Sequence, residues 1–248
     1  MSQRPRLLDW RSGGWLLLLM VVLVLAVVAW RGLPLLGTSS RAIGDGLNVE
    51  SYGFSMAGLN VPRDGVSAAG FPKDGMPALV DPDAMPGSGV VPLNESRRGK
   101  YIVTTDRVVG VVLGGEARAY PVRLLNWHEV INDTLGGIPI AVTYHPLCDS
   151  VVVFDRRMGE ETLVLQVSGL LWNSSQLLYS RSEKPGGESL YSQLQARAVT
   201  GPDAAAGKRL TVLPSEVVGW GYWKERHPDS TVIEQDPLFK KKYPTNPY

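Results

Sequence analysis

Few residues of this chain can do chemistry, and two of them lie in one short segment. Cys148, the single cysteine, stands three positions after His145 in the segment His-Pro-Leu-Cys. A thiolate and an imidazole separated by two residues have the spacing of metal-binding turns, in which both side chains point at one ion. The chain has three histidines, and His128 is the next one upstream of this segment. Function is therefore expected around Cys148.

The first hypothesis is a metal site. His145 and Cys148 would be two ligands and His128 the third, with a water molecule, Glu129 or Asp149 completing the coordination. Copper and zinc both accept imidazole and thiolate ligands, so the ligand types do not choose between these two ions.

Two further hypotheses belong to other classes. In a cysteine-dependent enzyme, Cys148 would be the nucleophile and His128 or His145 would activate it, while Asp149 and Ser150 supply polarisation. In a structural or interaction domain, Cys148 would be a small buried side chain, as free cysteines often are. The many polar and turn-forming residues around the motif argue against a simply packed strand.

The elements that must position these residues are mainly strands, and they predict an α+β fold with a β-rich core and a few short helices. Runs of β-branched residues predict strands at 101–105, 108–113, 138–144, 151–154 and 162–167, and Gly114-Gly115 predicts a hairpin turn into a strand at 116–120. Helices are expected at 121–132, which would carry His128, and at 215–226.

The N-terminal region predicts a membrane anchor. Residues 15–30 form an uncharged apolar run, bounded by Trp15 and Trp30 and preceded by Arg4, Arg6 and Arg11. Neighbouring small and apolar residues extend the run to 13–36, close to the roughly 20 residues that span a bilayer. The positive-inside rule places residues 1–12 in the cytoplasm and the rest of the chain outside it, periplasmic or extracellular. A cleaved signal peptide is the alternative, with Val27 and Ala29 as small residues before the cut.

Composition and segment character define the remaining organisation. The 248 residues carry a formal net charge of +1, which lacks the basic excess of a nucleic-acid binder, so nucleic acid is not an expected partner. Residues 37–72 are rich in Gly, Ser, Asn and Pro and are expected to form a linker. One globular domain is expected at 73–248. A single cysteine excludes an intramolecular disulfide.

The chain also resembles a known family. The order of its segments is similar to that of the DUF3179 family of uncharacterised proteins over roughly residues 73–248, through VVLGGEARAYPVRLLNWHEVINDTLGGIPIAVTYHPLCDSVVVFDRR, SGLLWNSSQLLYSR, SLYSQLQARAVTGP, LPSEVVGWGYWKERHPDS and KKKYPTNPY. The resemblance implies a family found largely in bacteria and archaea and frequently exported, with no established activity to transfer.

One departure from the family pattern bears on the hypotheses. Relatives commonly have Cys-Pro-Leu-Cys where this chain has His145-Pro146-Leu147-Cys148. Histidine cannot replace either cysteine of a dithiol redox pair, whereas it can replace a cysteine as a metal ligand. The resemblance therefore implies that a metal site or a Cys/His nucleophile is retained here, and that disulfide exchange within the motif is not.

Overall fold

The computed structural model describes residues 15–16, 19–24, 43–96, 100–182 and 187–248, in two units, Met1–Ala42 and Ile43–Tyr248. In the first unit, residues 15–16 and 19–24 are helical. Residues 1–12 and most of the predicted anchor, 13–36, lie outside the described residues. Within the part of the chain that is described, no helix is both long enough and apolar enough to cross a membrane.

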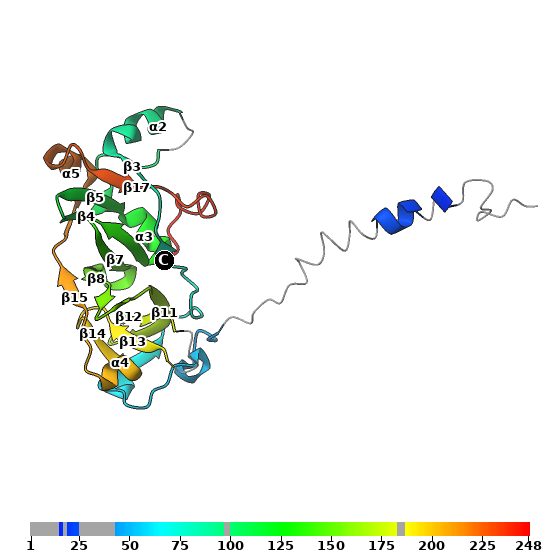
Figure 1. Ribbon diagram of the computed structural model, residues 1–248, viewed down its shortest axis with the longest axis vertical. Coiled ribbons are helices and arrows are strands. Elements are labelled where there is room, and N and C mark those ends of the chain that lie inside the picture. Colours follow the sequence, from blue (N-terminus) through cyan, green and yellow to red (C-terminus); the bar gives the residue numbers. More distant parts are fainter. Residues whose placement is uncertain (1–14, 17–18, 25–42, 97–99, 183–186) are drawn as a thin grey trace, which may run out of the picture. The chain divides into compact units, whose positions relative to one another are not determined.

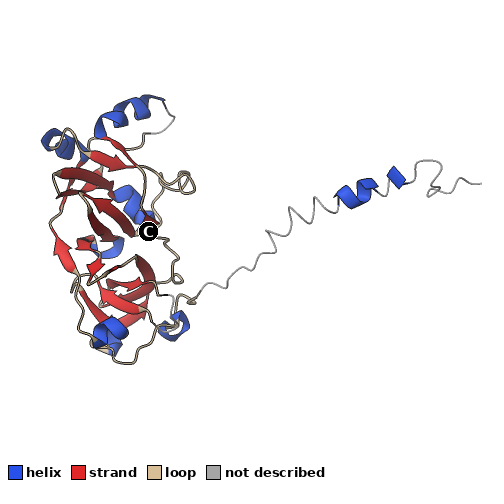
Figure 2. Cartoon of the chain, in the orientation of Figure 1, coloured by secondary structure: helices blue, strands red, loops and turns tan. Residues whose placement is uncertain are grey.

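Strands dominate the second unit, which confirms the predicted β-rich α+β fold (Figure 2). Its described residues form three five-stranded sheets, named A, B and C here, and one two-stranded hairpin. In spatial order, sheet A contains β1 (Val66–Ala68), β11 (Leu165–Trp172), β12 (Ser175–Ser180), β13 (Ser189–Ser192) and β14 (Arg197–Thr200). Sheet B contains β15 (Thr211–Leu213), β8 (Ser150–Asp155), β7 (Ile138–His145), β6 (Val130–Leu135) and β2 (Leu79–Val80). Sheet C contains β16 (Glu216–Gly219), β4 (Arg107–Leu113), β5 (Glu116–Pro121), β17 (Thr231–Ile233) and β3 (Ala84–Pro86), and the hairpin pairs β9 (Arg157–Met158) with β10 (Glu161–Thr162).

The helices of this unit are short. The α-helices are α2 (Val90–Ser96), α3 (Val122–His128), α4 (Pro202–Ala205) and α5 (Trp220–Arg226), and the 3₁₀ turns are η2 (Val49–Tyr52), η3 (Arg63–Gly65), η4 (Gly87–Gly89) and η5 (Pro146–Cys148). Helices this short are marginal by themselves and depend on packing against the sheets.

Sheet B lies between sheets C and A (Figure 1). Its strands contribute to two apolar cores: one shared with sheet C and α3, and the other shared with sheet A. A third core covers the opposite face of sheet A, where Tyr52, Phe54 and Val61 pack against Leu177 and Tyr179. The middle sheet is therefore buried on both faces, so a polar side chain on it must find a partner inside the protein.

Several predicted elements agree with the structure. The hairpin at Gly114-Gly115 is confirmed, because β4 and β5 pair in antiparallel register from Val108↔Pro121 to Leu113↔Glu116. Both glycines have positive φ, as a two-residue hairpin turn with a right-handed twist requires.

Three other predictions of secondary structure were wrong. Residues 101–105 form no strand; they hold an irregular segment that contacts α2 through the hydrogen bond from Asn94 to the Ile102 carbonyl. The helix expected at 121–132 ends at His128, where Glu129 adopts a left-handed conformation, and the chain continues as β6. The helix expected at 215–226 begins only at Trp220, because the preceding residues pair with β4 as β16.

Residues 37–72 were expected to form a linker, and their described part packs within the second unit. Residues from Ile43 onward belong to the second unit, and Val66 to Ala68 form β1 on the edge of sheet A. The side chains of Val49, Tyr52 and Phe54 are buried. These apolar residues cover a sheet face but do not recur with the period of a helix or a strand. Because the segment is also rich in turn-forming residues, its sequence pattern did not indicate that they are buried.

Candidate functional site

Cys148 lies in a tight connection between two central strands of sheet B. β7 ends at His145, Pro146 opens the 3₁₀ turn η5, Asp149 closes it with φ of 47°, and Ser150 begins β8. This connection leaves Cys148 exposed to solvent. The third hypothesis placed a buried cysteine here, and the exposed position contradicts that part of it. An exposed thiol contributes little to packing, so packing does not explain the residue.

Strand alternation decides which way His145 points. Successive side chains of a strand face opposite sides of a sheet. In β7, Ile140 and Val142 pack in the core shared with sheet C, whereas Ala141 packs in the core shared with sheet A. His145 has the same parity as Ala141 and Thr143, so its ring faces sheet A.

The register brings His145 close to the thiol through Ser150. His145 and Ser150 are direct partners in the antiparallel pair of β7 and β8, which places their Cβ atoms about 4.5–5.5 Å apart on one face. The Ser150 hydroxyl in turn lies 3.0 Å from Cys148 Sγ. Ser150 is therefore the cross-strand neighbour of His145 and also contacts the sulfur.

Hydrogen bonds link the thiol to sheet A. Ser150 Oγ donates to Gln193 Oε1 over 3.0 Å, and Gln193 Nε2 donates to Thr143 Oγ1 over 2.9 Å. The Thr143 hydroxyl then donates to the Val152 carbonyl. Because the Ser150 proton is directed at Gln193, its oxygen is free to accept the thiol proton of Cys148. Gln193 is fully buried and so holds Ser150 in place.

His145 is buried and lacks good hydrogen-bond partners. Its exposed fraction is 2%, and neither ring nitrogen has a hydrogen bond of good geometry. Burial lowers the pKa of His145, while the neighbouring Ser174 backbone acts in the opposite direction. The imidazole is therefore neutral near pH 7, and one nitrogen can accept a proton.

Charged groups surround the exposed side of the turn. Asp149 pairs with Arg107 over 3.0 Å and accepts a hydrogen bond from the Tyr144 hydroxyl. The bond from Arg107 lowers the pKa of Asp149, so this carboxylate is ionised. Burial and the contact with Asp149 raise the pKa of Tyr144 to about 12. These three residues fix the turn on the side facing solvent.

A buried carboxyl group, that of Glu129, lies near the end of β7. Glu129, directly after α3, is 1% exposed and accepts hydrogen bonds from Gln176 Nε2 and from the Tyr248 hydroxyl. Burial raises the pKa of Glu129 to about 7, although both hydrogen bonds act to lower it. Its backbone carbonyl accepts the amide of Tyr144, which fixes Glu129 beside the end of β7. A carboxyl group with this pKa can exchange a proton near neutral pH.

His128 is directed elsewhere. It is fully buried, with Nδ1 2.7 Å from the Pro77 carbonyl and Nε2 2.7 Å from the Tyr243 hydroxyl. Both ring nitrogens thus have partners within the fold, and burial lowers the pKa of His128. The described residues contain no group of three or more His, Cys, Asp or Glu side chains that could hold a metal ion. The predicted third ligand is therefore not brought to His145 and Cys148.

Comparison with known proteins identifies the family of this chain. The family model described as "Protein of unknown function (DUF3179)" matches residues 73–248. The chain belongs to the DUF3179 family. No match was found among curated proteins or among solved structures.

The DUF3179 match and the compact unit begin at different residues. The match starts at residue 73, whereas the unit starts at Ile43. Residues between these limits supply β1 and cover the outer face of sheet A. In this chain the DUF3179 region is therefore completed by a preceding segment.

Sequence reasoning missed three residues of the candidate site: Gln176, Gln193 and Tyr248. Both glutamines lie in or directly after strands that are otherwise buried, and each has an exposed fraction of 1% or less. A long polar side chain inside a run such as Ser-Gln-Leu-Leu-Tyr is the signal that could have identified Gln176. Nothing in the sequence pairs Gln193 with Ser150, because sheet packing creates that contact.

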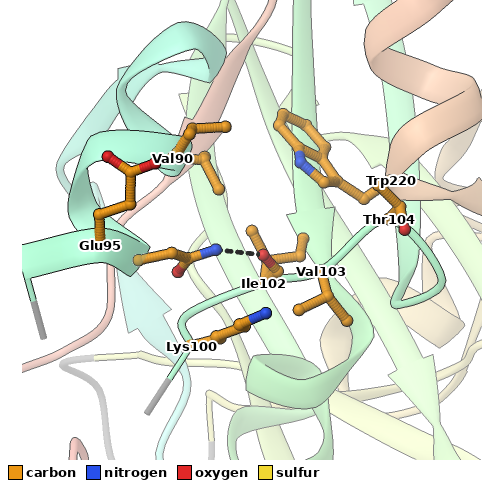
Figure 3. A pocket seen from close by; sticks show the side chains of 9 residues that line it. Val90, Glu95, Lys100, Ile102, Val103, Thr104 and Trp220 are labelled. Atoms are coloured by element: carbon orange, nitrogen blue, oxygen red, sulfur yellow. Dashed lines mark hydrogen bonds between the residues drawn. The ribbon is translucent and has the colours of Figure 1, made fainter. Parts of the chain in front are cut away.

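The DUF3179 domain also has a surface cavity of about 320 Å³ away from these residues (Figure 3). Val90, Ile102, Val103 and Trp220 line its apolar part, and Figure 3 shows Glu95 and Lys100 at its sides. It contains no cysteine or histidine, so it is not the candidate catalytic site.

Proposed function

We propose that this DUF3179 domain is a cysteine-dependent enzyme in which Cys148 is the nucleophile and His145 is the base. The observation that carries the proposal is the arrangement of Ser150, which contacts Cys148 Sγ and pairs directly with His145 in the sheet. Of the two histidines expected as the partner, His145 is the one proposed here, because the nitrogens of His128 already have partners.

The arrangement suits acyl transfer. A neutral His145 accepts the thiol proton while the Ser150 hydroxyl orients the sulfur, and the thiolate attacks a carbonyl carbon. The leaving group departs with a proton from His145, and water then releases the acyl group from Cys148. Disulfide chemistry within the turn is excluded, since Cys148 is the single cysteine of the chain.

The test is the rate of Cys148 alkylation by iodoacetamide at pH 7. We expect wild-type Cys148 to react at least tenfold faster than glutathione, and His145→Gln and Ser150→Ala each to lower the rate at least threefold. His227→Gln is the matched control, because His227 contacts Trp223 and Glu216 outside the site. Circular dichroism verifies that each variant is folded. A wild-type rate equal to that of glutathione would refute the proposal.

Metal analysis of the same samples tests the first hypothesis. The specific observation in its favour is that His145 has unpartnered ring nitrogens near an exposed cysteine. The metal-site hypothesis predicts that the wild-type protein binds about one equivalent of copper or zinc and that Cys148→Ser binds none. That result would support a metal site in place of a nucleophilic cysteine. Slow alkylation would accompany that result, because a metal-bound thiolate is protected.

We further propose that the chain is a single-pass membrane protein with residues 1–12 in the cytoplasm and the DUF3179 domain outside it. The apolar run at 15–30 and the arginines before it support this topology. Sedimentation of the full chain with membranes tests the anchor, and a soluble full chain would contradict it.

A further inference from the structure

The buried group at Glu129 lies on the same side of sheet B as the candidate catalytic residues. Glu129 contacts the side chain of Gln176 in β12. The backbone N–H of Gln193 donates to the backbone carbonyl of Gln176 over 3.2 Å. The Gln193 side chain in turn accepts from Ser150, which contacts Cys148. Gln176 and Gln193, which are hydrogen-bonded to each other through their backbones, therefore lie between Glu129 and the thiol, and their side chains contact the two groups.

This group contains an acceptor atom without a partner. Gln176 Oε1 is buried and has no hydrogen bond, and its residue is 1% exposed. In the described part of the chain, no lysine, arginine or histidine forms an ion pair with Glu129. An unsatisfied buried polar atom costs about 1–3 kcal/mol, so native proteins retain such atoms mainly where they serve function. The Glu129 carboxyl oxygens and Gln176 Oε1 are hydrogen-bond acceptors, so they suit a ligand that donates hydrogen bonds.

A side chain of the protein itself occupies part of this group. The Tyr248 hydroxyl donates to Glu129 Oε1, and Tyr248 also lies near Tyr144. Tyr248 is 41% exposed, whereas Glu129 is 1% exposed, so the phenol ring separates the carboxyl group from solvent. A phenol is thus a ligand that the site accommodates sterically and chemically.

We propose that Glu129 and Gln176 form a subsite for a neutral aromatic hydroxyl group, of the phenol class, and that Tyr248 occupies this subsite as a substitute for it. Because this subsite is taken to be part of the Cys148 site, the proposal rests on the proposed function. A substrate would place its aromatic hydroxyl on Glu129 and its reactive carbonyl toward Cys148. Tyr248 and the substrate would therefore compete for the same position.

The test uses N-acetyltyrosinamide as probe and N-acetylphenylalaninamide, which lacks the hydroxyl, as its matched control. Binding to the full chain and to Tyr248→Ala is measured by calorimetry at pH 8. We expect Tyr248→Ala to bind the tyrosine probe at least tenfold more tightly than the phenylalanine probe, and at least tenfold more tightly than wild type does. Addition of Glu129→Gln should reduce the preference for the hydroxyl at least threefold. Equal binding of both probes by Tyr248→Ala, or no binding of either, would overturn the subsite.

A second measurement separates this proposal from the proposed function. Saturating N-acetyltyrosinamide should slow iodoacetamide alkylation of Cys148 in Tyr248→Ala at least threefold. Hydroxyl-selective binding without such protection would refute the connection to Cys148 and leave a separate phenol site. Selective binding with a Cys148 rate equal to that of glutathione would refute the enzyme while retaining the subsite.

Discussion

At the scale of single residues, environment gives His128 and His145 different chemical properties. His128 has two hydrogen-bond partners, and His145 has none of good geometry, although both are buried. A histidine with satisfied nitrogens stabilises the fold, whereas an unpartnered neutral imidazole can accept a proton. Glu129 shows the same principle, because burial rather than residue type moves its titration toward neutral pH.

Glu129 should make stability depend on pH. Burial raises its pKa from 4.5 to about 7, so between these values the folded protein holds a proton that the unfolded chain has lost. Stability therefore falls as pH rises through this window, by up to about 3 kcal/mol at roughly 1.4 kcal/mol per pKa unit. Glu129→Gln removes the ionisation, so the free energy of unfolding of the variant minus that of wild type should increase from pH 4.5 to pH 8.

Urea unfolding at the two pH values measures this difference. Glu95→Gln is the matched control, since Glu95 is an exposed carboxylate of α2. A difference between Glu129→Gln and wild type that does not change with pH would contradict the prediction.

At the scale of elements, small residues and backbone conformation decide how the sheets approach their neighbours. In β4, a Cβ atom added at Gly110 would lie 2.1 Å from the Trp223 ring of α5. Trp223 is almost fully buried. Close approach of α5 to the sheet thus requires glycine at this position.

Gly110→Ala should lower the free energy of unfolding by about 1–3 kcal/mol, because the methyl group cannot fit without displacing the indole ring. The expected readout is a lower melting temperature together with altered tryptophan fluorescence. Gly89→Ala is the control, since a Cβ there meets only the Met85 sulfur at 3.9 Å. Similar melting temperatures for Gly110→Ala and wild type would show that α5 can shift without cost.

At the scale of the whole molecule, the folding unit is larger than the family match. Ile43–Tyr248 forms one compact unit, and residues before 73 cover one face of sheet A. The buried side chains that precede the family match in this unit are Val49, Tyr52, Phe54, Val61 and Val66. Each contributes about 1.5–3 kcal/mol on burial, and a domain is stable by only about 5–15 kcal/mol in total.

A chain of residues 43–248 should therefore fold cooperatively and remain in the supernatant when membranes are sedimented. A chain of residues 73–248 should lose most of its stability and bind dyes that detect exposed apolar surface. Melting curves and dye binding of the two chains, beside the full chain, measure this difference. Equal melting temperatures for the two truncated chains would show that the preceding segment is dispensable.

The sequence alone determined the properties that depend on local pattern. Alternating β-branched runs and paired glycines predicted the hairpin at 114–115 and the strands on both sides of the Cys148 turn. Segment order identified the family, and residue type singled out Cys148 and His145. These inferences needed only neighbours along the chain, because strand periodicity and turn chemistry act over a few residues.

Only the tertiary structure decided which of these residues meet. Gln193 reaches Ser150 and Gln176 reaches Glu129 because sheet A packs on sheet B, across 43 and 47 residues of chain respectively. Burial made His145 neutral and Glu129 weakly acidic, a left-handed residue ended α3 at His128, and packing placed His128 against Tyr243. Such contacts depend on packing between distant elements and on loss of water, which local periodicity does not encode.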